Sequence, residues 1–194
     1  MVRRHQKQGM NDLAEKPDRL PGELSRKAES ARMIRVDQAG EFGATRIYAG
    51  QLAILAGRAS GDVIGHMADQ ERVHLDKFDA LMNERRVRPT ALAPVWHVAG
   101  YALGAATALM GEKAAMACTV AVEEVIDDHY ARQAERLGEE DGALKSLIEE
   151  CRADEVAHKE TALEEGAKET PGYPVLSGAI KAGSRLAIWL SERV

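Results

Sequence analysis

A glutamate-histidine motif that occurs once in each half of this sequence constrains the fold more than any other feature. In each half a lone glutamate precedes Glu-x-x-His, by 30 residues in the first half and by 32 in the second. The six residues are Glu41, Glu71 and His74 in the first half, and Glu123, Glu155 and His158 in the second. Positions i and i+3 share one face of an α-helix, so each motif projects a carboxylate and an imidazole in the same direction. The repeat therefore predicts two matching halves.

Composition and periodicity predict a protein made only of helices. Aromatic residues are 4% of the chain, β-branched residues are scattered, and the helix-favouring Ala, Glu, Leu, Arg and Met dominate. The expected helices, divided at glycines and prolines, span residues 24–57, 61–86, 94–110, 112–137, 141–167 and 175–192. At 194 residues the chain suits one domain, expected at residues 26–194 after a flexible arm at residues 1–25.

The order of the motifs indicates one kind of helical bundle. Four long helices, of which two give lone glutamates and two give Glu-x-x-His, form the ferritin-like di-iron or di-manganese bundles. The connection over residues 87–111 is long, as a crossover between parallel second and third bundle helices requires. We therefore expect an all-α, ferritin-like four-helix bundle with a long crossover.

The six motif side chains offer a hard, mostly oxygen set of metal ligands. Four carboxylates and two neutral imidazoles suit two divalent iron or manganese ions and leave coordination positions open for O2. Four buried carboxylates cannot all stay ionised without cations, so bound metal is expected to stabilise the fold. In the alternative interpretation these residues are surface glutamates and solvated histidines.

Further site candidates lie near the lone glutamates. Tyr48 and Tyr130 each follow the lone glutamate of their half by seven residues and share its helix face. They would line a substrate cavity above the metals or be core tyrosines with satisfied hydroxyls. His129 would meet a substrate or be structural. Asp37, one turn before Glu41, is expected to accept a hydrogen bond from a ligand imidazole, the alternative being a surface aspartate.

Three glycines interrupt the expected helix at residues 24–57, although each costs roughly 1 kcal/mol against alanine. Gly40, Gly43 and Gly50 form, with Ile47, one stripe beside the stripe that carries Glu41. Such a smooth surface admits either a neighbouring helix or a flat substrate ring. The sequence leaves both uses open and favours helix packing.

Two segments predict contact with a membrane. Residues 90–111 hold no charged side chain, and residues 175–194 are amphipathic. Both tryptophans, Trp96 and Trp189, fall in these segments, and three arginines at positions 85, 86 and 88 precede the first. Tryptophan favours the lipid headgroup layer and arginine attracts anionic lipid. We expect two additional membrane-associating helices, with an ordinary buried helix as the alternative for residues 90–111.

Charge and cysteine usage exclude other classes. The net charge of -5, without a long basic run, argues against nucleic acid as a partner. Cys118 and Cys151 lie in apolar or helical surroundings, which indicates a reducing compartment and assigns neither to the chemistry. The polar first residues do not form a secretory signal, while Arg3 and Arg4 leave a transit peptide as an alternative.

Four stretches of the sequence are RVDQAGEFGATRIYAGQ, DQERVHLDKF, ACTVAVEE and ADEVAHKE. Together they resemble the demethoxyubiquinone hydroxylase family, from about Ser30 to the C-terminus. The resemblance implies a membrane-associated di-iron monooxygenase acting late in ubiquinone biosynthesis. With O2 it would hydroxylate the ring of 2-polyprenyl-3-methyl-6-methoxy-1,4-benzoquinol (demethoxyubiquinol) to give 3-demethylubiquinol.

The resemblance also implies roles for the six ligands around two iron ions per chain. Glu71 and Glu155 would bridge the irons, Glu41 and Glu123 would be terminal ligands, and His74 and His158 would each bind one iron. Electrons would come from the quinol itself or from NADH. The implied partners are the polyprenyl quinol, a membrane surface and other ubiquinone-biosynthesis proteins, including a lipid-binding partner. The expected location is the cytoplasmic face of a bacterial cell membrane or the matrix face of the mitochondrial inner membrane.

Two other functions are open at this point. A ferritin-type protein would use a similar site to oxidise and store iron, but it would need no contact with lipid. A membrane-surface scaffold would bind no metal.

Overall fold

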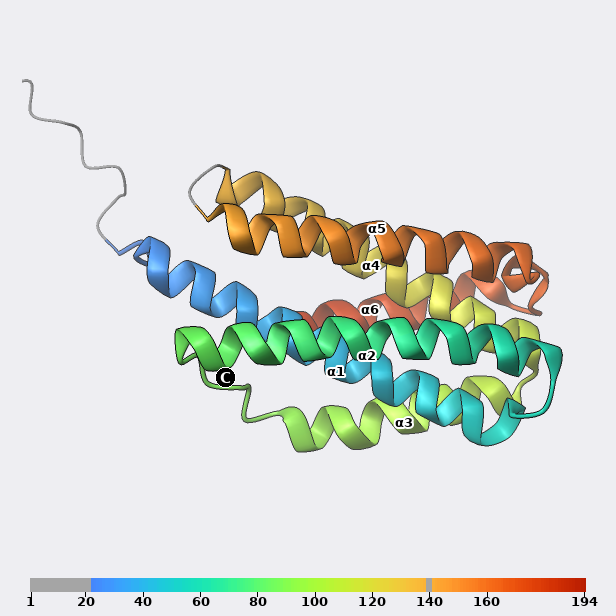
Figure 1. Ribbon diagram of the computed structural model, residues 1–194. Coiled ribbons are helices and arrows are strands. Elements are labelled where there is room, and N and C mark those ends of the chain that lie inside the picture. Colours follow the sequence, from blue (N-terminus) through green and yellow to red (C-terminus); the bar gives the residue numbers. More distant parts are fainter. Residues whose placement is uncertain (1–21, 139–140) are drawn as a thin grey trace, which may run out of the picture.

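The computed structural model describes residues 22–138 and 141–194, and all regular elements in these ranges are helical (Figure 1). The elements are α1 (Arg26–Leu55), α2 (Ala59–Arg85), α3 (Ala93–Leu109), α4 (Glu112–Leu137), α5 (Gly142–Glu164), the short 3-10 helix η1 (Ala167–Glu169) and α6 (Tyr173–Ser191). The all-α prediction is confirmed. The expected helix at 141–167 ends earlier, at Glu164, and η1 follows it. Most of the predicted arm, residues 1–21, lies outside the described residues.

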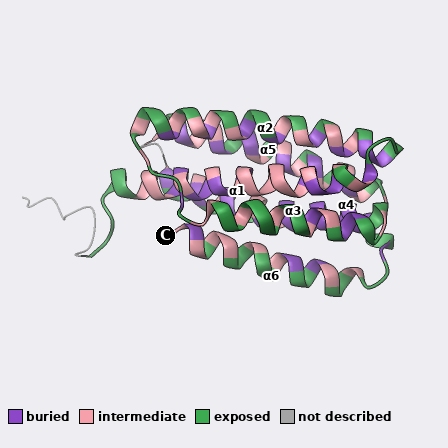
Figure 2. Ribbon diagram, turned by 90° about the horizontal axis from the view of Figure 1, so that it is seen from below, coloured by how far each residue is buried: buried purple, intermediate pink, exposed green. Residues whose placement is uncertain are grey.

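The helices form two antiparallel hairpins joined by a crossover. The first hairpin is α1 and α2, and the second is α4 and α5. Helices α2 and α4 run in the same direction, because α3 returns along α1 between them (Figure 1). The long crossover is confirmed, and the arrangement is consistent with a ferritin-like bundle. Helix α6 packs on α4, and α3 and α6 lie away from α2 and α5 (Figure 2).

Local sequence signals account for the helix ends. Helix α1 begins after Ser25, whose hydroxyl accepts a hydrogen bond from the backbone N–H of Ala28 at 3.2 Å. Helix α5 begins after Asp141, whose carboxylate accepts one from the N–H of Leu144 at 3.3 Å. Between α1 and α2 the chain turns at Gly57, where a φ of 83° favours glycine.

The crossover helix α3 lies against α1 at backbone contact distance. A Cβ atom on Gly50 would lie 2.2 Å from the carbonyl oxygen of Tyr101, and a Cβ on Gly104 would lie 1.9 Å from that of Ile47. Neither distance is sterically allowed, so only glycine at these positions lets the two backbones touch. Gly50 of the glycine stripe therefore serves helix packing, as the sequence favoured.

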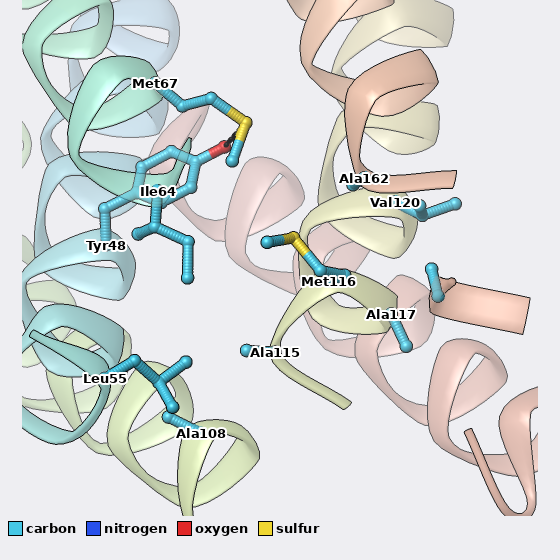
Figure 3. Close-up of a cluster of buried hydrophobic side chains, with 11 residues drawn as sticks. Tyr48, Leu55, Ile64, Met67, Ala108, Ala115, Met116, Ala117, Val120 and Ala162 are labelled. Atoms are coloured by element: carbon cyan, nitrogen blue, oxygen red, sulfur yellow. Dashed lines mark hydrogen bonds between the residues drawn. The ribbon is translucent and has the colours of Figure 1, made fainter. Parts of the chain in front are cut away.

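Apolar layers fill both ends of the bundle. One cluster contains Tyr48, Met67 and Met116 (Figure 3), and the other contains Ile34, Phe78, Ile148 and further buried side chains. Along α2, Met67 belongs to the first cluster and Phe78 to the second, and the Glu-x-x-His motif lies between them. The polar centre of the protein is therefore enclosed between two apolar plugs.

The outer faces of α3 and α6 expose apolar side chains. Of the eleven large hydrophobic residues exposed in the described ranges, eight belong to α3, its C-cap and α6. They are Val95, Val98, Tyr101, Leu109, Met110, Val175, Leu186 and Trp189. Within the described residues, none of the helices combines the length and apolar character needed to span a bilayer.

Candidate metal centre

The six side chains singled out by the repeat converge in the middle of the bundle. Helices α1 and α4 each give one glutamate, and α2 and α5 each give a glutamate and a histidine. Each of these residues is at most 2% exposed. Their ligand atoms form two groups, within each of which all atoms lie within 4.8 Å of one another. Glu41, Glu71, His74 and Glu155 make one group, and Glu71, Glu123, Glu155 and His158 make the other.

Both imidazoles turn the same ring atom toward the carboxylates. Nδ1 of His74 lies 3.6 Å from Oε2 of Glu41 and 3.5 Å from Oε1 of Glu155. Nδ1 of His158 lies 3.1 Å from Oε1 of Glu71 and 3.4 Å from Oε2 of Glu155. Glu155 thus stands between the two imidazoles. Glu71 and Glu155 are also the two residues that the metal-ligand groups share.

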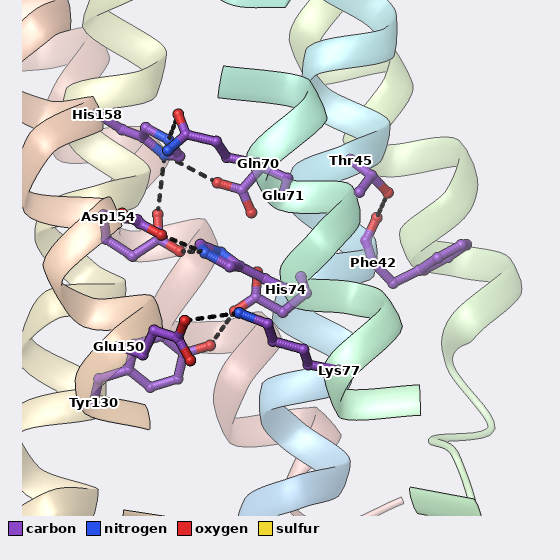
Figure 4. A network of polar contacts seen from close by, with 12 residues as sticks. Phe42, Thr45, Gln70, Glu71, His74, Lys77, Tyr130, Glu150, Asp154 and His158 are labelled. Carbon is purple, nitrogen blue, oxygen red and sulfur yellow. Dashed lines mark hydrogen bonds and ion pairs between the residues drawn. The ribbon is translucent and has the colours of Figure 1, made fainter. Parts of the chain in front are cut away.

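The outer ring nitrogens are held crosswise between α2 and α5 (Figure 4). Nε2 of His74 on α2 lies 2.9 Å from Oδ2 of Asp154 on α5, and Nε2 of His158 on α5 lies 3.2 Å from Oε1 of Gln70 on α2. An oxygen at Nε2 keeps the proton there and leaves Nδ1 free as a ligand. Sequence reasoning missed both orienting residues. The available signal was that each directly precedes its motif glutamate, in QERVH and DEVAH.

Each of the two tyrosines contacts the lone glutamate of the other half of the repeat. Tyr48 on α1 donates a hydrogen bond to Oε1 of Glu123 on α4 at 3.0 Å, and Tyr130 on α4 donates one to Oε1 of Glu41 on α1. Both tyrosines are 2% exposed and belong to the apolar clusters. Each therefore supports the lone glutamate of the other half. Their predicted contact with substrate stays a prediction.

Burial and mutual repulsion decide the charges in this cluster. Burial, followed by the neighbouring carboxylates, raises the pKa of Glu71 and that of Glu123 well above the ordinary carboxyl value. Burial also acts against ionised Glu155, but the imidazoles of His158 and His74, 3.4 and 3.5 Å away, outweigh it and lower the pKa of Glu155 to about 2. Burial lowers the pKa of His74, but the carboxylates of Glu155 and Glu41 outweigh it and raise that pKa to about 10. In the metal-free protein, bound protons therefore offset the negative charge of the buried carboxylates, as bound cations would.

The donor atoms fit a pair of divalent metal ions. Several buried atoms in the cage make no hydrogen bond to any described residue. They are Nδ1 of His74, Nδ1 of His158, both carboxylate oxygens of Glu71 and Oε2 of Glu155. Buried polar atoms without partners are costly, and coordination to a metal would satisfy them together. Oxygen and imidazole donors suit Fe²⁺ or Mn²⁺. The ligand roles of the individual residues stay predictions.

The expectation for Asp37 was wrong. Oδ1 of Asp37 lies 3.3 Å from Nε2 of His129 and accepts a hydrogen bond from Nε2 of Gln133 at 2.8 Å, whereas the ligand imidazoles contact other residues. The reason is geometric: Asp37 faces α4, and the ligand histidines lie on α2 and α5. Burial raises the pKa of Asp37. His129 lines a different cavity of about 430 Å³, whose wall also contains Trp189.

An apolar cavity of about 340 Å³ lies between α1, α3, α4 and α6, and none of the six cage residues lines it. Its wall includes Gly40 and Gly43, which flank Glu41 on α1, and Val122, which precedes Glu123 on α4. A Cβ on Gly43 would meet no atom within 4 Å. The glycine stripe therefore has two uses, since Gly50 packs against α3 whereas Gly40 and Gly43 leave room for this cavity.

Comparison with known proteins agrees with the repeat and the cage. The family model of the ubiquinone biosynthesis protein COQ7 matches residues 28–191. A 3-demethoxyubiquinol 3-hydroxylase of Rhodospirillum rubrum is 58% identical over 178 residues, which cover 91% of this chain and 84% of the relative. The mitochondrial NADPH-dependent 3-demethoxyubiquinone 3-hydroxylase of Homo sapiens is 53% identical, covering 84% of this chain and 77% of the relative. The mitochondrial 5-demethoxyubiquinone hydroxylase of Saccharomyces cerevisiae is 43% identical, again covering 84% and 77%.

These comparisons give no support to the ferritin-type alternative. The matched range contains all six cage residues and the full length of the four helices that carry them, apart from the first two residues of α1. The chain belongs to the COQ7 family of ubiquinone biosynthesis proteins.

Proposed function

We propose that this chain is a 3-demethoxyubiquinol 3-hydroxylase, a di-iron monooxygenase that hydroxylates the ring of demethoxyubiquinol with O2. The observation that carries this proposal is the pair of four-residue groups that share Glu71 and Glu155. Two ligand groups with two common carboxylates suit two ions joined by bridging glutamates. The relatives named for this reaction cover most of the chain.

The six cage residues would hold the irons, with Glu71 and Glu155 as bridges. Bound iron supplies the activation of O2 that an aromatic hydroxylation needs. The protein keeps the ligands in place: Asp154 and Gln70 fix the imidazole rings, while Tyr48 and Tyr130 each hold one oxygen of a terminal glutamate. The apolar plugs at both ends of the bundle keep bulk water from the site.

We place the quinol ring in the apolar cavity between α1, α3, α4 and α6. The cavity is lined mainly by small and apolar side chains, and Gly40 and Gly43, which lie on either side of Glu41 in the sequence, leave space for a flat ring. Two of its four walls are α3 and α6, the helices with exposed apolar faces. A polyprenyl tail that leaves between α3 and α6 would pass directly into lipid.

The exposed faces of α3 and α6 support peripheral attachment to a membrane. Side chains such as Val98 (66% exposed), Leu109 (72%) and Trp189 (51%) are available to enter the acyl boundary. Eukaryotic relatives are described as mitochondrial. For this chain we propose the cytoplasmic face of a bacterial cell membrane, with the matrix face of the mitochondrial inner membrane as the alternative.

The reductant is proposed to be a pyridine nucleotide bound in the 430 Å³ cavity that His129 lines. Several relatives are named NADPH-dependent. The 430 Å³ cavity is lined by Arg32, Arg132, Arg136 and Arg185, which suit nucleotide phosphates. It shares Val36 and Ile188 with the apolar cavity, so a nicotinamide ring there would lie close to the quinone. Arg185→Ala is expected to raise KM for NADPH without changing iron content. Lys168→Ala, outside this cavity, is the control.

The reaction is tested by incubating the iron-loaded protein with demethoxyubiquinol, O2 and NADPH. A product heavier by one oxygen atom, which carries ¹⁸O when ¹⁸O2 is supplied, is the expected result. Absence of this product with iron-loaded protein would refute the proposed activity.

The metal ligands are tested separately by iron analysis. Glu71→Ala and Glu155→Ala are each expected to lose both irons, because each is a proposed bridge. Glu84→Ala, an exposed position on the same helix as Glu71, should keep both. Equal iron content in the three variants would contradict the assignment.

A further inference from the structure

One thiol lies within reach of the cage. Cys151 on α5 is fully buried and precedes Glu155 by one turn. Its sulfur and one ligand atom each of Glu41 and His74 all lie within 4.8 Å of one another. The other cysteine, Cys118, is also fully buried, but it packs among Ala121, Val122 and Ile180 and belongs to none of the ligand groups.

A second observation marks this corner as a place for a cation. Nδ1 of His74 is buried, faces the carboxylates of Glu41 and Glu155, and makes no hydrogen bond to a described residue. The contact of Nε2 with Asp154 at 2.9 Å keeps this atom turned toward the carboxylates. An imidazole nitrogen oriented in this way beside a carboxylate and a thiol is arranged to bind a cation.

The two halves of the cage therefore differ in chemistry. The corner with Glu123 and His158 contains oxygen and nitrogen donors, whereas the corner with Glu41 and His74 also has a sulfur. Thiolate, imidazole and carboxylate together are the ligand types of zinc sites, and soft thiolates select thiophilic ions.

We propose that Glu41, His74 and Cys151 form a binding site for a thiophilic divalent cation such as Zn²⁺ or Cd²⁺. On binding, the thiol of Cys151 and the imidazolium of His74 each lose one proton to solvent, the thiolate and Nδ1 coordinate the ion, and no group is oxidised or reduced. The site overlaps one half of the proposed iron cage, so such an ion competes with iron for Glu41 and His74. Zinc binding here does not depend on the hydroxylase reaction.

Cobalt provides the optical test, because a thiolate bound to Co²⁺ gives a charge-transfer band in the near ultraviolet. Adding Co²⁺ to metal-free protein is expected to produce this band in the wild type and in Cys118→Ser, and to produce none in Cys151→Ser. Cys151→Ser is also expected to weaken Cd²⁺ binding by at least about tenfold. Binding of Mn²⁺, which prefers oxygen, is expected to change much less.

Cys151→Ala provides a second variant, and circular dichroism checks that each variant is folded. Cadmium-113 NMR of the wild-type protein reports sulfur coordination without any substitution, so the test does not require the variants to fold. A cadmium resonance typical of purely oxygen and nitrogen ligands, or a cobalt band that persists in Cys151→Ser, would overturn the proposal. Neither measurement involves turnover, so their outcome is separate from that of the hydroxylase assay.

Discussion

Adding one methyl group at Gly43 or at Gly50 is expected to have opposite effects on stability. A Cβ on Gly43 meets no atom within 4 Å, whereas a Cβ on Gly50 lies 2.2 Å from the carbonyl oxygen of Tyr101 and 2.7 Å from the backbone nitrogen of Ala105. Both glycines are inside α1, where replacement by alanine is otherwise worth about 1 kcal/mol. The steric surroundings therefore decide the sign of the change in each case.

The sizes follow from these distances. Gly43→Ala should raise the free energy of unfolding by about 1 kcal/mol, or Tm by about 2–4 °C for a domain of this size. Gly50→Ala forces α3 away from α1, and overpacking against fixed backbone atoms costs about 3 kcal/mol, at the upper end of the usual range. Subtracting the same gain of about 1 kcal/mol leaves about 2 kcal/mol of destabilisation, or a Tm lower by about 4–8 °C.

Thermal unfolding of metal-loaded protein gives the first measurement, and steady-state kinetics gives the second. Gly43→Ala puts a methyl group into the apolar cavity, so KM for the quinol should rise while Tm rises. Gly65→Ala is the matched control, because that glycine is also inside a helix with open space at Cβ but lies outside the cavity. Equal shifts of Tm for Gly43→Ala and Gly50→Ala would refute this reasoning, and so would an equal rise of KM in Gly65→Ala.

Three further predictions concern the cage, a helix cap and the membrane face. The pKa values of Glu71, Glu123 and His74 are higher in the folded metal-free protein than in the unfolded chain. Protonation of these side chains therefore stabilises the fold at a pH below their ordinary pKa values, and this stabilisation is lost as the pH rises through their raised pKa values. Tm of metal-free protein should therefore fall as pH rises from the ordinary carboxyl value toward about 10, the raised pKa of His74, while saturating Mn²⁺ removes the dependence; a flat profile without metal would contradict this. A hydrogen bond from Arg85 lowers the pKa of Asp141, so Asp141 stabilises the fold above the ordinary pKa and this contribution disappears as pH falls through the lowered value. Asp141→Ala, which also removes the cap of α5, should cost about 1 kcal/mol at pH 7 in denaturant titrations, and an unchanged midpoint would refute it. Trp189 is 51% exposed, so burying about 100 Å² of its ring in lipid is worth about 2 kcal/mol, and Trp189→Ser should weaken binding to anionic vesicles about 30-fold without loss of iron. If Trp189→Ser bound vesicles as well as the wild type, Trp189 would not be part of the surface that contacts the membrane.

Composition and the glycine and proline breaks predicted the helices, and the repeat predicted the convergence of the six cage residues. Ligand spacing within one helix is fixed by the helix itself, so the sequence specified which side chains share a face. The crosswise pairing of Asp154 with His74, and of Gln70 with His158, depends on how α2 and α5 lie against each other. Local spacing holds no information on that contact.

The lack of information on helix–helix contacts also explains the wrong expectation for Asp37 and the two different uses of the glycine stripe. Asp37 is one helical turn from Glu41, and both carboxylates contact α4, but only Glu41 also faces a ligand imidazole, that of His74 on α2. Gly43 and Gly50 share a face, but a Cβ on Gly50 would meet the backbone of α3, whereas a Cβ on Gly43 would meet no atom within 4 Å. The arginine-lined cavity was also missed, since its residues come from α1, α4 and α6 and lie far apart in the sequence.

The apolar layers at the two ends of the bundle affect how an ion reaches its ligands. At the seam of α2 and α5, between the two apolar layers, the Asp154 side chain is 40% exposed and holds Nε2 of the buried His74. An ion that enters or leaves by this seam would require Asp154 to release the imidazole first. A metal ion bound as the chain folds would therefore be retained longer than one held at an open surface site.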